Sequence, residues 1–96
     1  MAIFENVKPF RWNDEKNTLL QADRGISFEL VVTAIAEDKL LDVIEHPNQE
    51  KYSAQRIFVV EIDRYVYMVP FVESDDEIFL KTIIPSRKLK KKYLGD

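Results

Sequence analysis

The C-terminal segment KTIIPSRKLKKKYLG (residues 81–95) places cations directly behind an apolar run and a proline. Pro85 ends the run, and Ser86 can cap a short helix whose first turn holds Arg87 and Lys88. Cations there oppose the helix dipole at a cost of roughly 0.3–1 kcal/mol each. A phosphate would be favoured by that dipole, by free N–H groups and by the planar fork of arginine. The segment is therefore either a solvated basic tail, which its charge alone favours, or a phosphate-binding site.

The charge of the chain is divided unevenly along its length. Residues 1–80 contain eight basic and sixteen acidic residues, a formal charge of −8, whereas residues 81–96 contain six basic residues and one acidic residue, or +5. The net charge of −3 argues against a general nucleic-acid coat. Any contact with nucleic acid is therefore expected to be local, at the C-terminal segment.

Few other residues offer chemistry. Lys81 is expected on a strand, sharing a face with Phe79 and Ile83, either as an edge lysine or as a charge directed into a cleft. The only histidine, His46, lies in EHPN and is more typical of a loop residue than of a general base. The chain has no cysteine and two distant glycines, which argues against a zinc or iron site and against a nucleotide-binding loop. We therefore predict neither a metal nor a cofactor.

Four tyrosines form an aromatic set. On strands they usually pack in the core or at its rim, and beside a basic patch they can stack on a base or transfer a proton. The lysines next to Tyr93 favour such a role for that tyrosine, whereas core packing stays the simpler reading of Tyr52, Tyr65 and Tyr67.

Two helices are expected to precede the strands. Asn13 can cap the first helix, which ends near Arg24 with Gly25 as the left-handed residue that follows. Ser27 can cap a second helix that continues to Glu37. Its apolar stripe follows the spacing i, i+3, i+4 and i+7 and consists of Phe28, Val31, Val32 and Ile35. This stripe is expected to face the sheet.

Residues 56–62, 65–72 and 78–84 read as three strands joined by short turns, which favours an antiparallel order. The apolar residues 40–44 are too few to assign to a helix or a strand. Pro70 should mark a bulge or a part of its strand without a partner on one side, and Leu89 and Tyr93 should pack the last helix on the sheet. We predict one α+β domain over residues 1–96: an N-terminal αα-hairpin packed on a three-stranded or slightly larger antiparallel sheet, followed by a short basic helix.

The stretch FRWNDEKNTLLQADRGISF (residues 10–28) resembles the N-terminal signature of the BrnT-type toxins of bacterial toxin–antitoxin pairs, and IIPSRK (residues 83–88) resembles their IISARK segment. The resemblance spans about residues 10–93. Three residues depart from the family pattern: Asn13 replaces an Asp, Arg24 replaces a His, and Thr82 replaces a basic residue. The positions that match at the family's spacing are Phe10, Trp12, Lys16, Gly25, Ile26, Ser27 and Phe28.

This resemblance implies a RelE-like toxin fold and a metal-independent endoribonuclease that acts on mRNA or other single-stranded RNA. It also implies silencing by a cognate antitoxin that binds DNA. Arg87 and Arg56 match arginines of the family pattern, and Tyr93 lies near its C-terminal tyrosine. We therefore expect Arg87 to bind the phosphate, Arg56 and the weaker candidate Lys81 to add positive charge, and Tyr93 to act as an acid or orienting group. The residues expected to hold the RNA are Lys88, Lys90, Lys91, Lys92 and Arg24.

Overall acidity and the replacement of the family's His by Arg24 leave a second interpretation open. The chain could be a catalytically silent protein of the same fold that acts as a protein-interaction module. In both cases the absence of a leader and of a long apolar stretch predicts a cytoplasmic protein with no membrane partner. A homo-oligomer is a further option.

Overall fold

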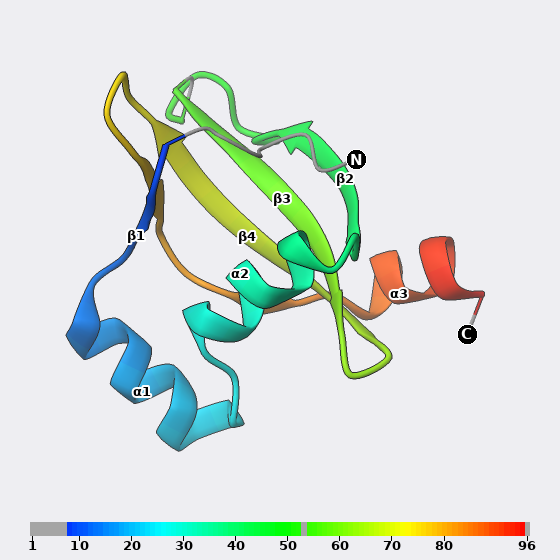
Figure 1. Cartoon of the computed structure of the whole chain (residues 1–96). Helices are drawn as coiled ribbons and strands as arrows, with labels where there is room; N and C mark the ends of the chain where they lie inside the picture. Colours follow the sequence, from blue (N-terminus) through cyan, green and yellow to red (C-terminus); the bar gives the residue numbers. More distant parts are fainter. Residues whose placement is uncertain (1–7, 53, 96) are drawn as a thin grey trace.

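A computed structural model of the protein describes residues 8–52 and 54–95 and confirms the α+β class (Figure 1). The elements in chain order are β1 (Phe10–Arg11), α1 (Asp14–Arg24), α2 (Phe28–Ala36), β2 (Leu40–Glu45), β3 (Gln55–Ile62), β4 (Tyr65–Glu73), β5 (Ile78–Leu80), β6 (Ile84–Pro85) and α3 (Arg87–Leu94).

The ends of the first two helices follow the sequence prediction. The Asn13 side chain accepts a hydrogen bond from the backbone N–H of Lys16 at 2.9 Å, and the Ser27 hydroxyl accepts one from Leu30 N–H at 3.2 Å. Gly25 follows α1 with φ of 65°, in the left-handed region that glycine adopts at no steric cost. The local sequence thus sets where both helices begin and where α1 ends.

The sheet is larger and less regular than predicted. Its strand order is β1-β5-β4-β3-β2, with β6 paired to β4 beyond the end of β5. β3 and β4 form a long antiparallel hairpin, and β2 adds to β3, so residues 40–44 lie in a strand. β1 runs parallel to β5. The expected antiparallel sheet is therefore a mixed six-stranded sheet.

The predicted strand over residues 78–84 is wrong in its second half. β5 ends at Leu80, residues 81–83 lie outside the strands, and β6 pairs with Tyr67 and Met68. Pro70 explains the interruption. Its C=O accepts the Lys81 N–H at 2.8 Å, and its ring nitrogen has no hydrogen to return a bond on that side. Pro70 thus marks a part of β4 without a continuous ladder, as expected, and Lys81 is not a strand residue.

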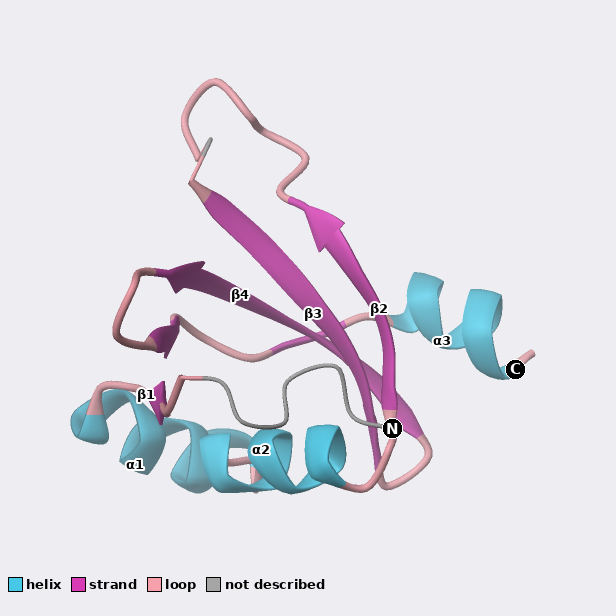
Figure 2. Ribbon diagram, turned by 45° about the horizontal axis from the view of Figure 1, so that its top comes forward, coloured by secondary structure: helices cyan, strands magenta, loops and turns pink. Residues whose placement is uncertain are grey.

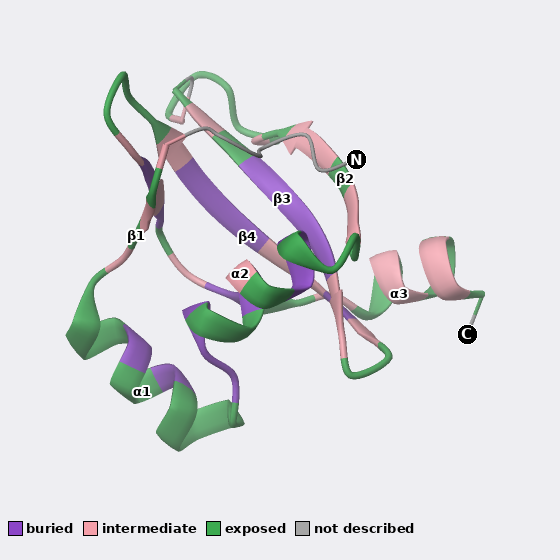
Figure 3. Cartoon of the chain, viewed as in Figure 1, coloured by how far each residue is buried: buried purple, intermediate pink, exposed green. Residues whose placement is uncertain are grey.

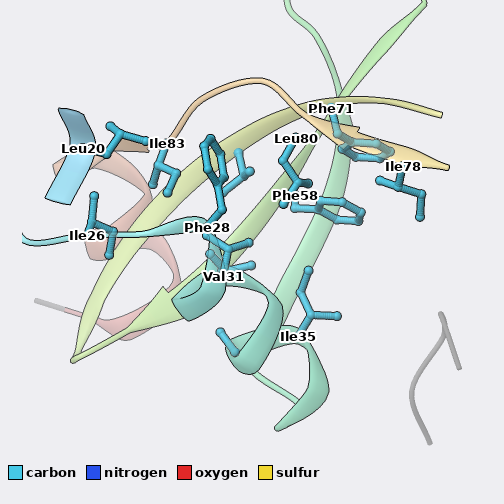
Figure 4. Packing of buried hydrophobic residues seen from close by; sticks show 13 residues of the cluster. Leu20, Ile26, Phe28, Val31, Ile35, Phe58, Phe71, Ile78, Leu80 and Ile83 are labelled. Atoms are coloured by element: carbon cyan, nitrogen blue, oxygen red, sulfur yellow. The ribbon is translucent and has the colours of Figure 1, made fainter. Parts of the chain in front are cut away.

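One face of the sheet is closed by α2. Val31 and Ile35 of α2 are buried in one cluster with Phe58 and Phe71 (Figure 4). Val32 is partly buried and packs against the same cluster. The predicted orientation of the second helix is therefore confirmed. The strand residues on this face that belong to the core are Phe58, Val60, Val69, Phe71, Ile78 and Leu80.

The predicted αα-hairpin does not pack on the sheet as a unit. α1 has two buried residues, Asn17 and Leu20, and most of its surface is exposed (Figure 3). Asn17 ties it to α2, because its side-chain oxygen accepts the Phe28 N–H at 2.8 Å and its amide donates to Glu29 Oε1 at 2.8 Å. Of these two helices only α2 covers the sheet, and α1 lies beside residues 79–84.

The third helix lies on the other side of the strands from α1 and α2 (Figure 2). Val59 and Val66, which are fully buried, point to this second face, since their neighbours Phe58 and Val60 face α2. The molecule therefore has three layers, with the sheet between α2 and α3. In the part of the chain that the structure describes, no helix is long and apolar enough to cross a membrane.

Candidate nucleic-acid interface

α3 is attached to the sheet at its N-terminal end. Ser86 N–H donates to the Val66 C=O of β4 at 2.9 Å, and the Ser86 hydroxyl caps the helix by accepting the Leu89 N–H at 3.2 Å. Leu89 and Tyr93, one turn apart, are half-buried. Both point toward the second face of the sheet, as the i, i+4 spacing predicts. The opposite side of α3 is left to solvent.

The solvent side of α3 is basic. Arg87, Lys88, Lys91 and Lys92 are exposed, whereas Lys90 is half-buried, with its Nζ 5.5 Å from the Tyr65 ring centroid. The first turn contains no acidic residue to offset Arg87 and Lys88. Within residues 8–52 and 54–95 the ion pairs of Glu73 with Lys8 and Arg56 include none of the four exposed cations of α3. The structure thus presents the positive charge that the sequence predicts on one helical surface.

Tyr93 makes a defined contact with the sheet. Its hydroxyl donates to Asp42 Oδ2 of β2 at 2.7 Å. This bond, with the Val43 N–H and the charge of Lys92, lowers the pKa of Asp42. The same bond raises the pKa of the Tyr93 hydroxyl above its ordinary value. Tyr93 in this arrangement orients α3, and it would have to leave Asp42 before it could donate a proton to a substrate.

Arg56 lies on the α2 face, at the far end of the β3–β4 hairpin from the connecting turn. It is opposite Glu45 in the ladder, and its guanidinium carbon lies 5.2 Å from the Phe71 ring centroid. Its Nη2 donates to Glu73 at 2.6 Å, and Lys8 Nζ donates to the same carboxylate at 2.6 Å. The bond from Lys8, followed by the charges of both cations, lowers the pKa of Glu73. Arg56 is engaged in a surface cluster of charges.

Arg56 and Tyr93 therefore lie on opposite faces of the sheet. Arg56 shares a face with Phe58, which α2 covers, whereas Asp42, the partner of Tyr93, points the other way because Val43 pairs with Phe58. Two side chains separated by a sheet cannot contact one phosphate. The structure does not bring these two residues into one site.

Lys81 and Arg24 border a third region, between α1 and residues 79–84, at two separate cavities. Arg24 Nη1 donates to the Ile83 C=O at 3.2 Å and lines a cavity of about 340 Å³. Lys81 is exposed, with its Nζ 5.6 Å from the Phe79 ring centroid, and lines a neighbouring cavity of about 470 Å³. Lys16 lines both cavities. The position of Lys16 between the two cavities was not predicted from the sequence, where Lys16 was noted only as a match to the family pattern.

The structure also assembles two tyrosines that sequence reasoning left to core packing. The ring centroids of Tyr65 and Tyr67 are 5.6 Å apart, and both residues are half-buried near α3. The sequence signal for this pair was the i, i+2 spacing in YVY, which puts both side chains on one face of a strand. Within the described ranges, no group of three or more His, Cys, Asp or Glu side chains is placed to hold a metal ion.

Comparison of the chain with family models, curated proteins and solved structures gave no match. The resemblance to BrnT-type toxins therefore stays a prediction that rests on the residues quoted for it.

Proposed function

We propose that this chain is the toxin of a bacterial toxin–antitoxin pair, a cytoplasmic endoribonuclease that holds single-stranded RNA on α3. The observation that carries the proposal is the exposed basic surface of that helix, formed by Arg87, Lys88, Lys91 and Lys92. The ladder and Ser86 fix the start of the helix, so its cations are presented from a defined position. Such a surface suits a chain of phosphates better than a single small anion.

The proposed reaction needs no metal. The ribose 2′-oxygen forms a bond to the adjacent phosphorus, the bond from phosphorus to the 5′-oxygen breaks, and a cyclic phosphate remains. A base takes the 2′-proton and an acid protonates the 5′-oxygen. Arg87 would bind the phosphate, since its fork matches two oxygens and stabilises the charge that develops on them. Tyr93 would act as acid or orienting group once its bond to Asp42 opens.

The opposed positions of Arg56 and Tyr93 favour a second candidate. A chain that keeps the fold and the basic helix, and lacks a convergent catalytic set, would be a silent interaction module. Its α3 would then bind RNA or an acidic partner protein without cleaving it. The two candidates differ in whether the RNA is cleaved. Both require the α3 cations for binding.

Arg87→Ala tests the enzyme directly. Wild type, Arg87→Ala, Arg87→Lys and the matched control Arg11→Ala, which removes an exposed arginine at the opposite end of the chain, are incubated with single-stranded RNA. We expect Arg87→Ala to abolish cleavage, Arg87→Lys to rescue it poorly because a point charge does not reproduce the fork, and Arg11→Ala to cleave normally. Full cleavage by folded Arg87→Ala would remove Arg87 from the site, and binding without cleavage by wild type would select the silent module.

A salt titration tests the binding that both candidates share. Each phosphate neutralised on single-stranded RNA contributes about −0.7 to the slope of log affinity against log salt, so three or four contacts give roughly −2 to −3. Replacement of Lys88, Lys90, Lys91 and Lys92 by Gln should flatten the slope and leave the fold intact. Absence of RNA binding by wild type at about 50 mM salt would overturn the proposed RNA site. A cognate antitoxin that covers α3 should carry an acidic segment.

A further inference from the structure

Tyr65 and Tyr67 lie where four elements meet. They begin β4, directly after the β3–β4 turn, and their rings are tilted by 56° with centroids 5.6 Å apart. Tyr67 is paired with Pro85 of β6. The next residue, Ser86, attaches the start of α3 to β4 through its backbone hydrogen bond to Val66. The end of α1 reaches the same place through Arg24, which is bonded to the Ile83 C=O. Residues far apart in the sequence thus surround two aromatic rings.

Two cations act on these rings from different helices. Lys90 of α3 has its Nζ 5.5 Å from the Tyr65 ring centroid, within the range of a cation–π contact. Burial, followed by the charges of Tyr65 and Asp63, raises the pKa of the Tyr67 hydroxyl, and the charge of Arg24 of α1 opposes this rise. Asp63, in the β3–β4 turn, is an acidic residue whose charge acts on Tyr67. The cluster therefore combines aromatic faces with positive charge on two sides.

A nucleotide matches this combination. Its base has a flat face that stacks on tyrosine in a largely sequence-independent way, and its phosphate is attracted by lysine and arginine. Core packing accounts for Tyr67, which lies at the margin of the cluster under α2. Tyr65 lies on the same face of β4 as Tyr67 but outside that cluster, at the place where Lys90 of α3 approaches its ring. Its half-buried ring offers an aromatic surface beside a helix that presents four exposed cations.

We propose that Tyr65, flanked by Tyr67, Lys90 and Arg24, is a nucleobase-stacking site that holds one base of a single-stranded RNA. The proposal rests on the proposed function and names the part of the RNA that lies beside the phosphates on α3. In this arrangement α3 supplies electrostatic affinity, and Tyr65 distinguishes a chain with bases from a bare polyanion.

The experiment compares RNA with and without bases. Labelled single-stranded RNA of about 12 nucleotides, a length within the range of known single-strand sites, and an abasic strand of the same length are titrated with the full chain. Tyr65→Leu removes the aromatic face and keeps apolar volume, and Tyr65→Phe keeps the face. Tyr52→Leu is the matched control, since Tyr52 lies in the loop after β2, where its ring is tilted against that of His46 with 4.2 Å between centroids.

One stacked base is worth about 1–3 kcal/mol, so Tyr65→Leu should weaken binding of base-bearing RNA by roughly 5- to 150-fold. Tyr65→Phe should restore the affinity, and all variants should bind the abasic strand equally. An equal loss on both strands, or no loss on either, would overturn the stacking site. If the α3 Gln variant loses RNA binding while Tyr65→Leu does not, the proposed function stands and the stacking site fails. If wild type binds neither strand, both fail.

Discussion

The two faces of the sheet are covered by helices of opposite character. On one face α2 buries Phe28 and Val31 completely against the strands, in a cluster that also contains Phe58 and Phe71. On the other face α3 contains no fully buried residue and contacts the sheet through half-buried Leu89 and Tyr93. α2 is therefore part of the hydrophobic core, whereas α3 lies on the surface of the sheet and presents charged side chains to solvent.

This difference separates the stability of the molecule from its proposed binding. Burial of apolar area dominates stability, and it is concentrated under α2. The cations of α3 contribute little to folding, because exposed charges are screened by water and salt. They can therefore be placed to suit a ligand. Substitutions on the two helices should consequently fall into two classes, with large effects on unfolding for the buried residues of α2 and small ones for the residues of α3.

The largest effect is expected at Ile35. Ile35→Ala removes buried methyl groups next to fully packed neighbours and should lower the free energy of unfolding by about 2–5 kcal/mol. Leu30→Ala on the same helix is the control, because Leu30 is 41% exposed, and it should cost about 0.5 kcal/mol or less. Denaturant unfolding measures both. Equal effects of the two substitutions would mean that α2 does not face the sheet as described.

The next largest effect is expected at Asn17, which joins α1 to α2. Asn17→Ala leaves the buried N–H of Phe28 without its partner and removes the bond to Glu29, so it should cost about 1–3 kcal/mol. Thr18→Ala changes the neighbouring exposed position and should stay within about 0.5 kcal/mol. If unfolding midpoints of the two variants coincide, the Asn17 bonds do not hold the helices together.

The contrast between these sites shows what the sequence could predict. Helix caps are local, so Asn13, Gly25 and Ser27 could be assigned from their neighbours alone. The role of Asn17 could not be predicted, because its hydrogen-bond partners, Phe28 and Glu29, lie beyond a turn. Their position relative to Asn17 depends on how the two helices meet. The early end of β5 likewise depends on Pro70, a residue of the neighbouring strand, and no pattern within 78–84 reveals it.

The candidate site divides in the same way. The basic α3 surface could be predicted, since charge and helical spacing are contained in one short segment. The separation of Arg56 from Tyr93 could not, because it depends on which helix covers which face. It also depends on the irregular register between Leu40 and Asp42, which helps to decide where Asp42 points. The Tyr65 cluster required the approach of α1, β6 and α3.

A smaller effect on stability is expected at Leu89, the apolar anchor of α3. Its side chain is only half-buried, so Leu89→Ala should cost about 1 kcal/mol, well below Ile35→Ala. The loss should be local, with faster hydrogen exchange in α3 and unchanged exchange in the core strands. Lys91→Ala is the control at an exposed position of the same helix. Equal acceleration of exchange in β3 would show that α3 and the core unfold together.

The smallest effect is expected at Tyr93, and its sign depends on pH. Tyr93→Phe removes the hydrogen bond to Asp42 on an exposed surface, which should cost less than about 1 kcal/mol near neutral pH. The pKa of Asp42 is lowered in the folded chain, so this stabilisation is present above the unfolded value of about 3.9 and is lost as pH falls through the folded value. The pKa of Tyr93 is raised, so the stabilisation is present below the unfolded value of about 10 and is lost as pH rises through the folded value.

The difference in unfolding free energy between wild type and Tyr93→Phe should therefore be greatest between about pH 5 and 9 and should shrink on both sides of that range. Tyr52→Phe is the control, because Tyr52 is remote from Asp42 and its substitution should give a difference without this pH profile. Urea unfolding at a series of pH values measures it. A difference that stays constant from acid to alkaline pH would show that the Tyr93 hydroxyl does not bind the Asp42 carboxylate. The attachment of α3 would then rest on its other contacts, among them those of Leu89, Ser86 and Lys90.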